Sequence, residues 1–349
     1  MSISGIDIDR LRAWMDAQGL EHGPIADAVL LTGGTQNVLL RFRRGERTFV
    51  LRRPPVNPRP GNNATMLREA RVLGALAGSD VPHPALIAAC ADPDVLGAAF
   101  YLMDNVAGFN ATVALPRLHA GDPAVRHAMG LALVDGAAAL GRVDHRAVGL
   151  ADFGNADDYL ARQVARWQGQ LDGYGAIQDW PGREGLPAVD AIAAWLAQSV
   201  PPGFTPGVIH GDYSIGNVMY RNDGPGLAAI IDWELATIGD PLIDLGWIMA
   251  TWPGAGGPDL AVLRVDPWSG FPAIDEMVER YRTQTSRDTS RLDWYGVLAC
   301  YKLAILLEGT FARACAGKVP MAVGERLHDT AVRLLRRAEY RIAAMPCAG

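Results

Sequence analysis

The sequence predicts an α+β protein with two lobes, and three observations support that fold class. Strand-like runs dominate the chain as far as residue 104, helix-length apolar patterns dominate after it, and a connector over 103–108 separates the two regions. With 349 residues, 49% of them apolar, the chain is long and hydrophobic enough to bury a sizeable core. We therefore expect a small N-terminal lobe over 1–104, built on an antiparallel sheet, and a larger, mostly helical C-terminal lobe over 105–349.

The N-terminal lobe is expected to contain two helices and five strands. An amphipathic helix over Asp9–Gln18 ends at Gly19, and a helix over Thr65–Leu76 carries apolar residues at helical spacing. The strands are predicted from short apolar or alternating runs: Ala28–Thr32, Val38–Phe42, Thr48–Arg52, Leu86–Cys90 and Ala99–Met103.

The C-terminal lobe is expected to contain seven helices and two short strands. The helices are predicted over Pro123–Val143, Asn155–Gln170, Ala188–Gln198, Pro241–Ala250, Ile274–Thr283, Leu292–Ala316 and Val323–Ala343. The strands Val218–Tyr220 and Ala228–Ile231 flank a turn containing glycine and proline. The segment Leu171–Gly185, rich in glycine and aromatic residues, is consistent with an active-site flap and equally with a connection of no functional importance.

The net charge of −6 is unevenly distributed along the chain. Between Arg41 and Arg71 there are nine arginines and two glutamates, a local charge of +7, which leaves −13 for the remaining residues. An acidic protein with one basic segment suits a compact anion such as a polyphosphate, and it argues against a nucleic-acid partner. Arginines on the solvent face of a strand would give the same pattern, so the segment alone does not decide between these interpretations.

Neither secretion nor a membrane span is expected. Acidic residues interrupt the first ten residues, where a signal peptide needs an apolar core. The most apolar helix contains Lys302, Glu308 and Arg313, and no uncharged run reaches the roughly 18 residues that a span requires. The four cysteines form no Cys-x-x-Cys pair, which indicates neither a disulfide framework nor a zinc site. We expect a cytoplasmic protein.

Residues suited to catalysis concentrate between positions 210 and 244. The segment HGDYSIGN over 210–217 places a carboxylate and an amide five positions apart in a glycine-containing loop before a short strand. The partner strand ends near Asp232, so a hairpin would bring Asn217 and Asp232 to the same end, where two oxygen ligands can hold Mg²⁺ on phosphate oxygens. Asp212 is then available to accept a proton, and this division of roles is what phosphoryl transfer requires.

Three segments in a fixed order resemble a known family: His-Gly-Asp-x-x-x-x-Asn at 210–217, Ile-Asp-Trp-Glu at 231–234 and Gly-Asp-Pro-Leu-Ile-Asp-Leu at 239–245. They are similar to the aminoglycoside phosphotransferases, which share the protein-kinase fold. Within that family, VLRRPP at 50–55, FYLM at 100–103 and DWELATIG at 232–239 resemble the kinase-like domains associated with acyl-CoA dehydrogenases. The resemblance implies a protein-kinase-like bilobal fold that uses Mg²⁺ and ATP, with GTP left open as the nucleotide.

The resemblance also implies roles for individual residues. Asp212 matches the catalytic base, and Asn217 and Asp232 match the Mg²⁺ ligands. Arg52 matches the strand cation that reaches the nucleotide phosphates, a position where the family usually has lysine. Glu69 matches the helix acid that orients this cation.

Two further segments match parts of the family that contact the nucleotide. Gly33, Gly34 and Thr35 fall in the loop expected to cover the phosphates, where glycine lets backbone amides approach an anion. Met103 and Asn105 fall in the hinge whose backbone pairs with adenine, and the same residues would also serve as an ordinary link between lobes.

Several neighbouring polar residues are interpreted as structural. Asp240 and Asp244 lie near a helix start, where acids are favoured, and are expected to cap the helix and brace the catalytic loop. His210 is expected to be a buried hydrogen-bonding residue, because Asp212 already fills the role of base. Glu234 is expected to have a structural part in preference to binding a second metal.

Two cations of the C-terminal lobe are candidates for contacting the acceptor. Lys302 and Arg313 are eleven residues apart, close to a whole number of helical turns, so they lie on nearly one face of an otherwise apolar helix. This pair suits an acceptor bearing phosphate or carboxylate; salt bridges to the acid-rich lobe are the alternative.

These observations predict an ATP- and Mg²⁺-dependent phosphotransferase acting on a hydroxyl of a small molecule. A hydroxyacyl thioester and an aminoglycoside-like compound both stay open as acceptor, and so does the oligomeric state. The alternative is a nucleotide-binding pseudokinase that acts as a scaffold, which the arginine at position 52 would favour. Other enzyme classes lack their motifs: Ser214 has no Gly-x-Ser-x-Gly setting, and no His-Glu-x-x-His or Ala-Pro-Glu is present.

Overall fold

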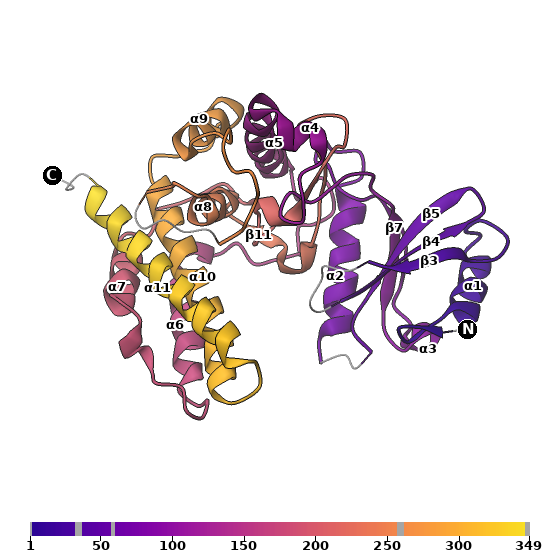
Figure 1. Cartoon of the computed structure of the whole chain (residues 1–349), viewed down its shortest axis with the longest axis horizontal. Coiled ribbons are helices and arrows are strands. Elements are labelled where there is room, and N and C mark those ends of the chain that lie inside the picture. The colour runs from indigo at the N-terminus through magenta and orange to yellow at the C-terminus, as the bar shows by residue number, and fades with distance from the viewer. Residues whose placement is uncertain (1, 32–36, 57–59, 257–261, 346–349) are drawn as a thin grey trace. The chain divides into compact units, whose positions relative to one another are not determined.

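The computed structural model describes residues 2–31, 37–56, 60–256 and 262–345, and the chain divides into two compact units (Figure 1). The first comprises Met1–Gly108 with Ala228–Ala236, and the second comprises Phe109–Leu227 with Thr237–Gly349. The sequence predicted one boundary, between residues 104 and 105. The boundary lies four residues later, and the chain returns to the first unit over 228–236. No change of composition marks this return, because it depends on contacts such as the hydrogen bond from the Ile230 amide to the Pro82 carbonyl, at 2.8 Å.

The first unit is built on a five-stranded antiparallel sheet of order β3-β4-β5-β7-β6. Its strands are β3 (Ala26–Leu30), β4 (Val38–Arg44), β5 (Arg47–Arg53), β6 (Leu86–Cys90) and β7 (Phe100–Asp104). Its helices are α1 (Ile8–Ala17), α2 (Asn62–Ala75) and α3 (Pro93–Leu96), and the short strands β1 (Ser2–Ile3) and β2 (Ile6–Asp7) precede them. The five predicted strands are confirmed to within two residues; α3, β1 and β2 were not predicted.

The two faces of this sheet differ in chemistry. Directly opposed residues of antiparallel strands point to the same side, so the register places Leu39, Arg52 and Tyr101 together on one face. The other face packs against α1 and forms the core of the unit: Leu11, Met15, Leu40, Phe42, Phe49, Leu51, Phe100 and Leu102. Helices α1 and α2 lie on opposite sides of the sheet (Figure 1). The face that carries Arg52 is therefore the polar one, on the side of α2.

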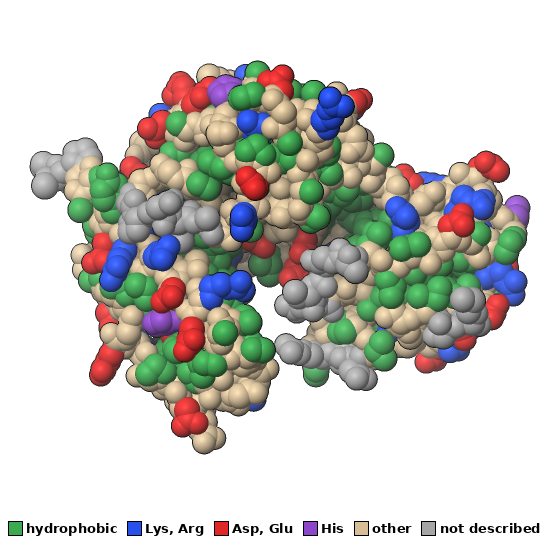
Figure 2. Space-filling view, viewed as in Figure 1, with side chains coloured by type: hydrophobic (Ala, Val, Ile, Leu, Met, Phe, Trp, Pro, Cys, Tyr) green, Lys and Arg blue, Asp and Glu red, His purple; other side chains and the backbone are tan. Residues whose placement is uncertain are grey.

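The edge strand β3 and the residue that follows it expose hydrophobic side chains. Val29, Leu30 and Leu31 are 47%, 40% and 37% exposed, and Figure 2 shows hydrophobic side chains gathered over this part of the first unit. The next residues, 32–36, lie outside the described residues and include Gly33, Gly34 and Thr35. The predicted phosphate-covering loop therefore stays a prediction.

The second unit is mostly helical. Its helices are α4 (Arg117–Gly121), α5 (Pro123–Arg142), α6 (Tyr159–Tyr174), α7 (Val189–Gln198), α8 (Leu242–Thr251), α9 (Ile274–Gln284), α10 (Leu292–Cys315) and α11 (Met321–Ala344). The seven predicted helices are confirmed to within two residues, except that α6 begins and ends four residues later than expected. The predicted strands appear as β9 (Val218–Tyr220) and as β10 (Leu227–Ile230), which from residue 228 on belongs to the first unit. The pair β8 (Gly207–Ile209) and β11 (Thr237–Gly239) in the second unit was not predicted.

Helix α10 is the interior helix of the second unit. In the described ranges it is the one helix long and apolar enough to cross a membrane by length and composition, and 72% of its most apolar stretch is buried. Helices α6, α7, α8 and α11 pack against it, so its apolar surface is covered by the protein itself. The approach of α8 is close, since a Cβ added to Gly246 would lie 2.6 Å from the Tyr295 carbonyl oxygen.

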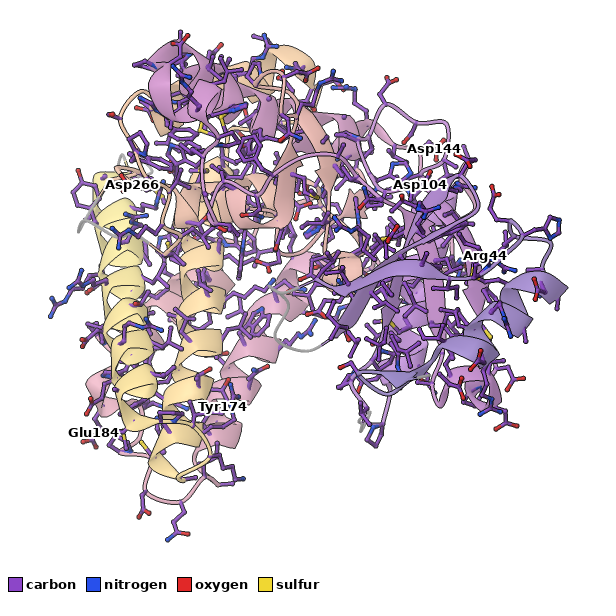
Figure 3. All side chains as sticks on the ribbon, turned by 45° about the vertical axis from the view of Figure 1, so that its right-hand side comes forward. Arg44, Asp104, Asp144, Tyr174, Glu184 and Asp266 are labelled. Carbon is purple, nitrogen blue, oxygen red and sulfur yellow. The ribbon has the colours of Figure 1, made fainter. Side chains whose placement is uncertain are left out.

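The segment 171–185 is anchored to α10. Helix α6 continues to Tyr174, so the first four residues are helical, contrary to the sequence prediction of a loop. The Tyr174 hydroxyl donates to the Ile305 carbonyl at 3.1 Å, and the Trp180 indole donates to buried Glu308 at 2.7 Å. Figure 3 shows Tyr174 and Glu184 together at one end of the helical unit.

Candidate active site

The predicted catalytic loop follows β8 and lies within the second unit. Between β8 and the short 3₁₀ turn over Ile215–Asn217, the backbone passes through Gly211 with a φ of +86°, a left-handed conformation that favours glycine. Asp212 and Asn217 are partly exposed, whereas His210 is fully buried. The loop therefore presents one carboxylate and one amide to the outside.

Asp212 and Asn217 are in direct contact. The Asn217 side-chain amide donates to the Asp212 carboxylate oxygen Oδ2 at 2.8 Å and to the Asp212 carbonyl at 2.9 Å. The two hydrogen bonds fix the carboxylate relative to the loop. They also use the nitrogen of the Asn217 amide, so its oxygen is the atom suited to a metal ion.

Asp244 braces the loop from α8, as the sequence predicted. Its two carboxylate oxygens accept the backbone N–H groups of His210 and Gly211 at 2.7 and 2.8 Å. Burial raises the pKa of Asp244, while its contact with His210 and the two backbone hydrogen bonds act in the opposite direction. Asp240 accepts the Leu242 N–H at 3.1 Å, which is the predicted capping role.

Lys302 reaches the same loop from α10. Its ammonium donates to the Gly211 carbonyl at 2.7 Å and lies 4.4 Å from the centre of the Trp247 ring. Burial lowers the pKa of Lys302 to about 8, against the opposing charges of Asp212 and Asp244. Trp247 lies in the core, and its contact with a cation was not predicted from the sequence.

Arg52 lies at the centre of an acidic cluster in the first unit. Its Nε is 2.9 Å from Glu69 Oε2, its Nη2 donates to Asp232 Oδ1 at 2.7 Å, and Glu234 is 4.0 Å away. The predicted pairing of Arg52 with Glu69 is thus present, and Glu234 lies beside the same cation. One positive and three negative groups leave the cluster with a formal charge of −2.

Burial dominates the electrostatics of this cluster. Burial raises the pKa of Glu69 to about 7, with Arg52 opposing the shift and Asp232 reinforcing it. Burial alone would lower the pKa of Arg52, but Glu69, Tyr101 and Asp232 outweigh it, so the arginine stays charged. The Tyr101 hydroxyl donates to Glu69 at 2.9 Å and holds it beside Arg52.

The two predicted Mg²⁺ ligands belong to different units. Asp232 is part of the segment that returns to the first unit, whereas Asn217 lies in the second, so the expectation that 105–349 contains both is corrected. Asp232 has a φ of +66°, uncommon for a residue other than glycine, and this conformation accompanies its contact with Arg52. Their convergence on one ion stays a prediction.

The donor set nevertheless suits a hard cation. A carboxylate beside surplus negative charge and an amide oxygen are ligands that Mg²⁺ accepts in proteins, where it keeps water and phosphate oxygens as its other ligands. Within the described ranges, no group of three or more His, Cys, Asp or Glu side chains is arranged to hold a metal ion. Each of the two predicted ligands, taken by itself, is thus of a donor type that suits Mg²⁺.

The remaining predicted residues have different positions. Met103 pairs with Val50 on the face of the sheet that carries Arg52, and Asn105 follows β7 and lines a cavity of about 230 Å³ in the first unit. Arg313 is exposed and donates to the Thr310 hydroxyl at 2.7 Å, whereas Lys302 donates to the Gly211 carbonyl. A larger cavity of about 520 Å³ in the second unit contains none of the predicted residues.

The chain is similar to known proteins over most of its length. The family model described as "Phosphotransferase enzyme family" matches residues 27–279. Acyl-CoA dehydrogenase family member 11 of Gallus gallus is 31% identical over 322 residues, which cover 88% of this chain and 39% of that protein. The chain thus spans about two fifths of the length of this relative.

Solved structures resemble the chain over nearly its whole length. A crystal structure from Ralstonia eutropha JMP134, named as a candidate aminoglycoside phosphotransferase, has a TM-score of 0.81 at 29% identity and covers 98% of this chain and 100% of that one. A ternary complex of aminoglycoside phosphotransferase APH(4)-Ia with ADP and hygromycin B has a TM-score of 0.57 at 16% identity, covering 92% and 97%. The latter likeness concerns the fold alone.

Proposed function

This chain belongs to the phosphotransferase enzyme family, and from that premise we propose that it transfers the γ-phosphoryl group of ATP to a hydroxyl group of a small molecule, with Mg²⁺ as cofactor. The observation that carries the proposal is the catalytic loop. Asp212 is partly exposed, its carboxylate is fixed by Asn217, and the backbone before it is braced by Asp244. A pre-positioned carboxylate is what a hydroxyl acceptor requires.

Asp212 acts as the base in this proposal. It orients the acceptor hydroxyl and takes its proton while the acceptor oxygen bonds to the γ-phosphorus and the bond to the ADP oxygen breaks. The hydrogen bond from Asn217 keeps the carboxylate in one orientation, so little reorganisation is needed during the reaction. The products are a phosphate ester and ADP.

Arg52 holds the phosphates of the nucleotide in this proposal, and Glu69 orients it. Bound Mg²⁺ would neutralise charge on the phosphoryl oxygens, with Asn217 and Asp232 as its ligands. The excess of carboxyl groups over cations around Arg52 supports this assignment, because a divalent cation would offset their negative charge. Met103 and Asn105 are proposed to lie beside the nucleobase of the nucleotide. GTP is the alternative to ATP.

We favour a hydroxyacyl thioester as the acceptor over an aminoglycoside-like compound. The relative from Gallus gallus carries the name of an acyl-CoA dehydrogenase, and the part of it that this chain matches would then act on a related acyl compound. Comparing a hydroxyacyl-CoA panel with an aminoglycoside panel under identical Mg-ATP conditions tests the choice. Phosphorylation of the aminoglycosides alone would reverse it.

The reaction itself is tested with Asp212 variants. The protein is incubated with Mg-ATP and fractionated metabolites, and products that gain one phosphate are detected by mass spectrometry. Asp212→Ala and Asp212→Asn should lower turnover by about 10²–10⁴-fold while nucleotide binding is retained. Equal turnover in the wild type and both variants would refute the assignment of the base.

The scaffold alternative has one observation in its favour. Arg52 replaces the usual lysine, and its guanidinium is engaged by Glu69 and Asp232 within the first unit. A scaffold of this kind would bind nucleotide with no turnover in the wild type. Binding of Mg-ATP by calorimetry, together with no ATP consumption in the presence of any acceptor fraction, would support it.

A further inference from the structure

Lys302 is one of only two lysines in the chain, the other being Lys318, among 32 basic residues. It extends from α10 between two tryptophans, with its ammonium 4.4 Å from the centre of the Trp247 ring and 5.5 Å from that of Trp167. Both rings are nearly fully buried. A cation in such a setting is fixed in place by the aromatic rings and by its hydrogen-bond acceptor.

That acceptor is the carbonyl of Gly211, at 2.7 Å. This carbonyl belongs to the peptide group that joins Gly211 to Asp212, and the N–H of the same group donates to His210 Nδ1 at 3.3 Å. Asp244 holds the preceding N–H groups. Lys302 and His210 thus hold opposite ends of the one peptide group from which the Asp212 side chain projects.

The conformation of Gly211 makes this restraint important. Glycine adopts a φ of +86° without strain, but it adopts other φ values just as readily. The loop therefore has little intrinsic preference for the backbone conformation seen at Gly211. Without the ammonium, the carbonyl would lose a charge-assisted hydrogen bond in a buried setting. The peptide group could then rotate and carry the Asp212 carboxylate away from its position.

We propose that Lys302 is a positioning residue that sets the orientation of Asp212 through the Gly211 carbonyl, and that it does not bind the acceptor. The inference rests on the proposed function. It differs from the sequence-based expectation that Lys302 and Arg313 bind an acidic acceptor together, because the ammonium is committed to the loop while Arg313 is exposed.

The hydrolysis of Mg-ATP by water separates the two roles, because no organic acceptor is present. If Lys302 only bound the acceptor, replacing it would leave the rate of this hydrolysis unchanged. A positioning residue would lower its kcat, and we expect Lys302→Met to lose about 100-fold in kcat with the KM for ATP changed less than about twofold. The kcat of Lys302→Arg should be about tenfold higher than that of Lys302→Met, because arginine restores the positive charge but not the compact geometry of the ammonium group.

Lys318 supplies the matched control. It is exposed in the turn between α10 and α11, so Lys318→Met should leave both constants unchanged. Unchanged kcat in Lys302→Met, or a rise in the KM for ATP with constant kcat, would overturn the proposal. Equal losses in Lys302→Met and Lys302→Arg would also overturn it.

A second measurement does not depend on activity or on a variant at position 302. Carbon-13 labelling at lysine Cε gives two NMR signals, and Lys318→Arg identifies which belongs to Lys302. We expect the Lys302 signal to titrate with a midpoint near pH 8, well below the ordinary lysine value of 10.5, and to shift in Asp212→Asn. A midpoint of the Lys302 signal near the ordinary value of 10.5 would overturn the placement of Lys302.

The two experiments also separate this inference from the proposed function. Wild-type protein that consumes no ATP with water or any acceptor would refute the phosphotransferase proposal. A Lys302 signal that titrates low and responds to Asp212→Asn would in that case still support the contact with the catalytic loop.

Discussion

Replacing Arg52 by methionine tests whether one cation holds the acidic cluster of the first unit together. Arg52 is 8% exposed and Glu69 is 1% exposed, and the ion pair between them spans 2.9 Å. Removing one partner of a buried pair costs about 3–5 kcal/mol when the other stays charged. Glu69 can escape part of this cost by taking a proton, because its pKa is already raised to about 7.

The cost of Arg52→Met should therefore depend on pH. Glu69 has a folded-state pKa above its ordinary value of 4.5, so its contribution to stability is complete below pH 4.5 and is lost as the pH rises through 7. Without Arg52 this pKa rises further, and the variant keeps losing stability above pH 7 by up to about 1.4 kcal/mol per pH unit. Between pH 6 and pH 8.5 the cost of the substitution should grow by about 2 kcal/mol.

Urea unfolding followed by circular dichroism at pH 6 and pH 8.5 measures this difference. The double variant Arg52→Met/Glu69→Gln should lose the pH dependence, because the carboxyl that titrates is gone. Arg47→Met is the control, since Arg47 and Asp104 form a half-exposed pair in the same unit, worth at most about 1 kcal/mol at either pH. An equal cost of Arg52→Met at both pH values would refute the reasoning.

Two further substitutions test the packing of α8. Asp244→Asn should lower the free energy of unfolding by about 2 kcal/mol and reduce kcat. The reason is that the NH₂ of the asparagine would face the N–H of His210 or Gly211, which then loses its acceptor. An unchanged free energy of unfolding together with an unchanged kcat would contradict the bracing role. Gly246→Ala should cost about 1–3 kcal/mol, because its Cβ would lie 2.6 Å from the Tyr295 carbonyl oxygen. Differential scanning calorimetry measures the second effect, and an unaltered Tm would argue against close packing of α8 on α10.

Local sequence patterns were enough for most of the secondary structure. The strands over 86–90 and 218–220 occur at the predicted residues, because each is a short apolar run that ends at turn-forming or polar residues. The pair β8 and β11 was missed, since three-residue strands are too short to produce a periodic signal. The spacing of Asp212 and Asn217 likewise placed both residues in one loop, although their direct hydrogen bond was not predicted.

The sequence by itself determined the family and the two-lobed architecture, and it located the loop that is proposed to be catalytic, because these depend on patterns that are contiguous in the chain. Only the tertiary structure decided that Asp232 pairs with Arg52 and that Lys302 holds the Gly211 carbonyl. These contacts join residues 180 and 91 positions apart. Each depends on how whole elements pack: α10 brings the ammonium to the loop, and the return of 228–236 to the first unit brings the carboxylate to the sheet. Periodicity encodes which face of an element is buried, but it does not encode which buried charge meets which partner.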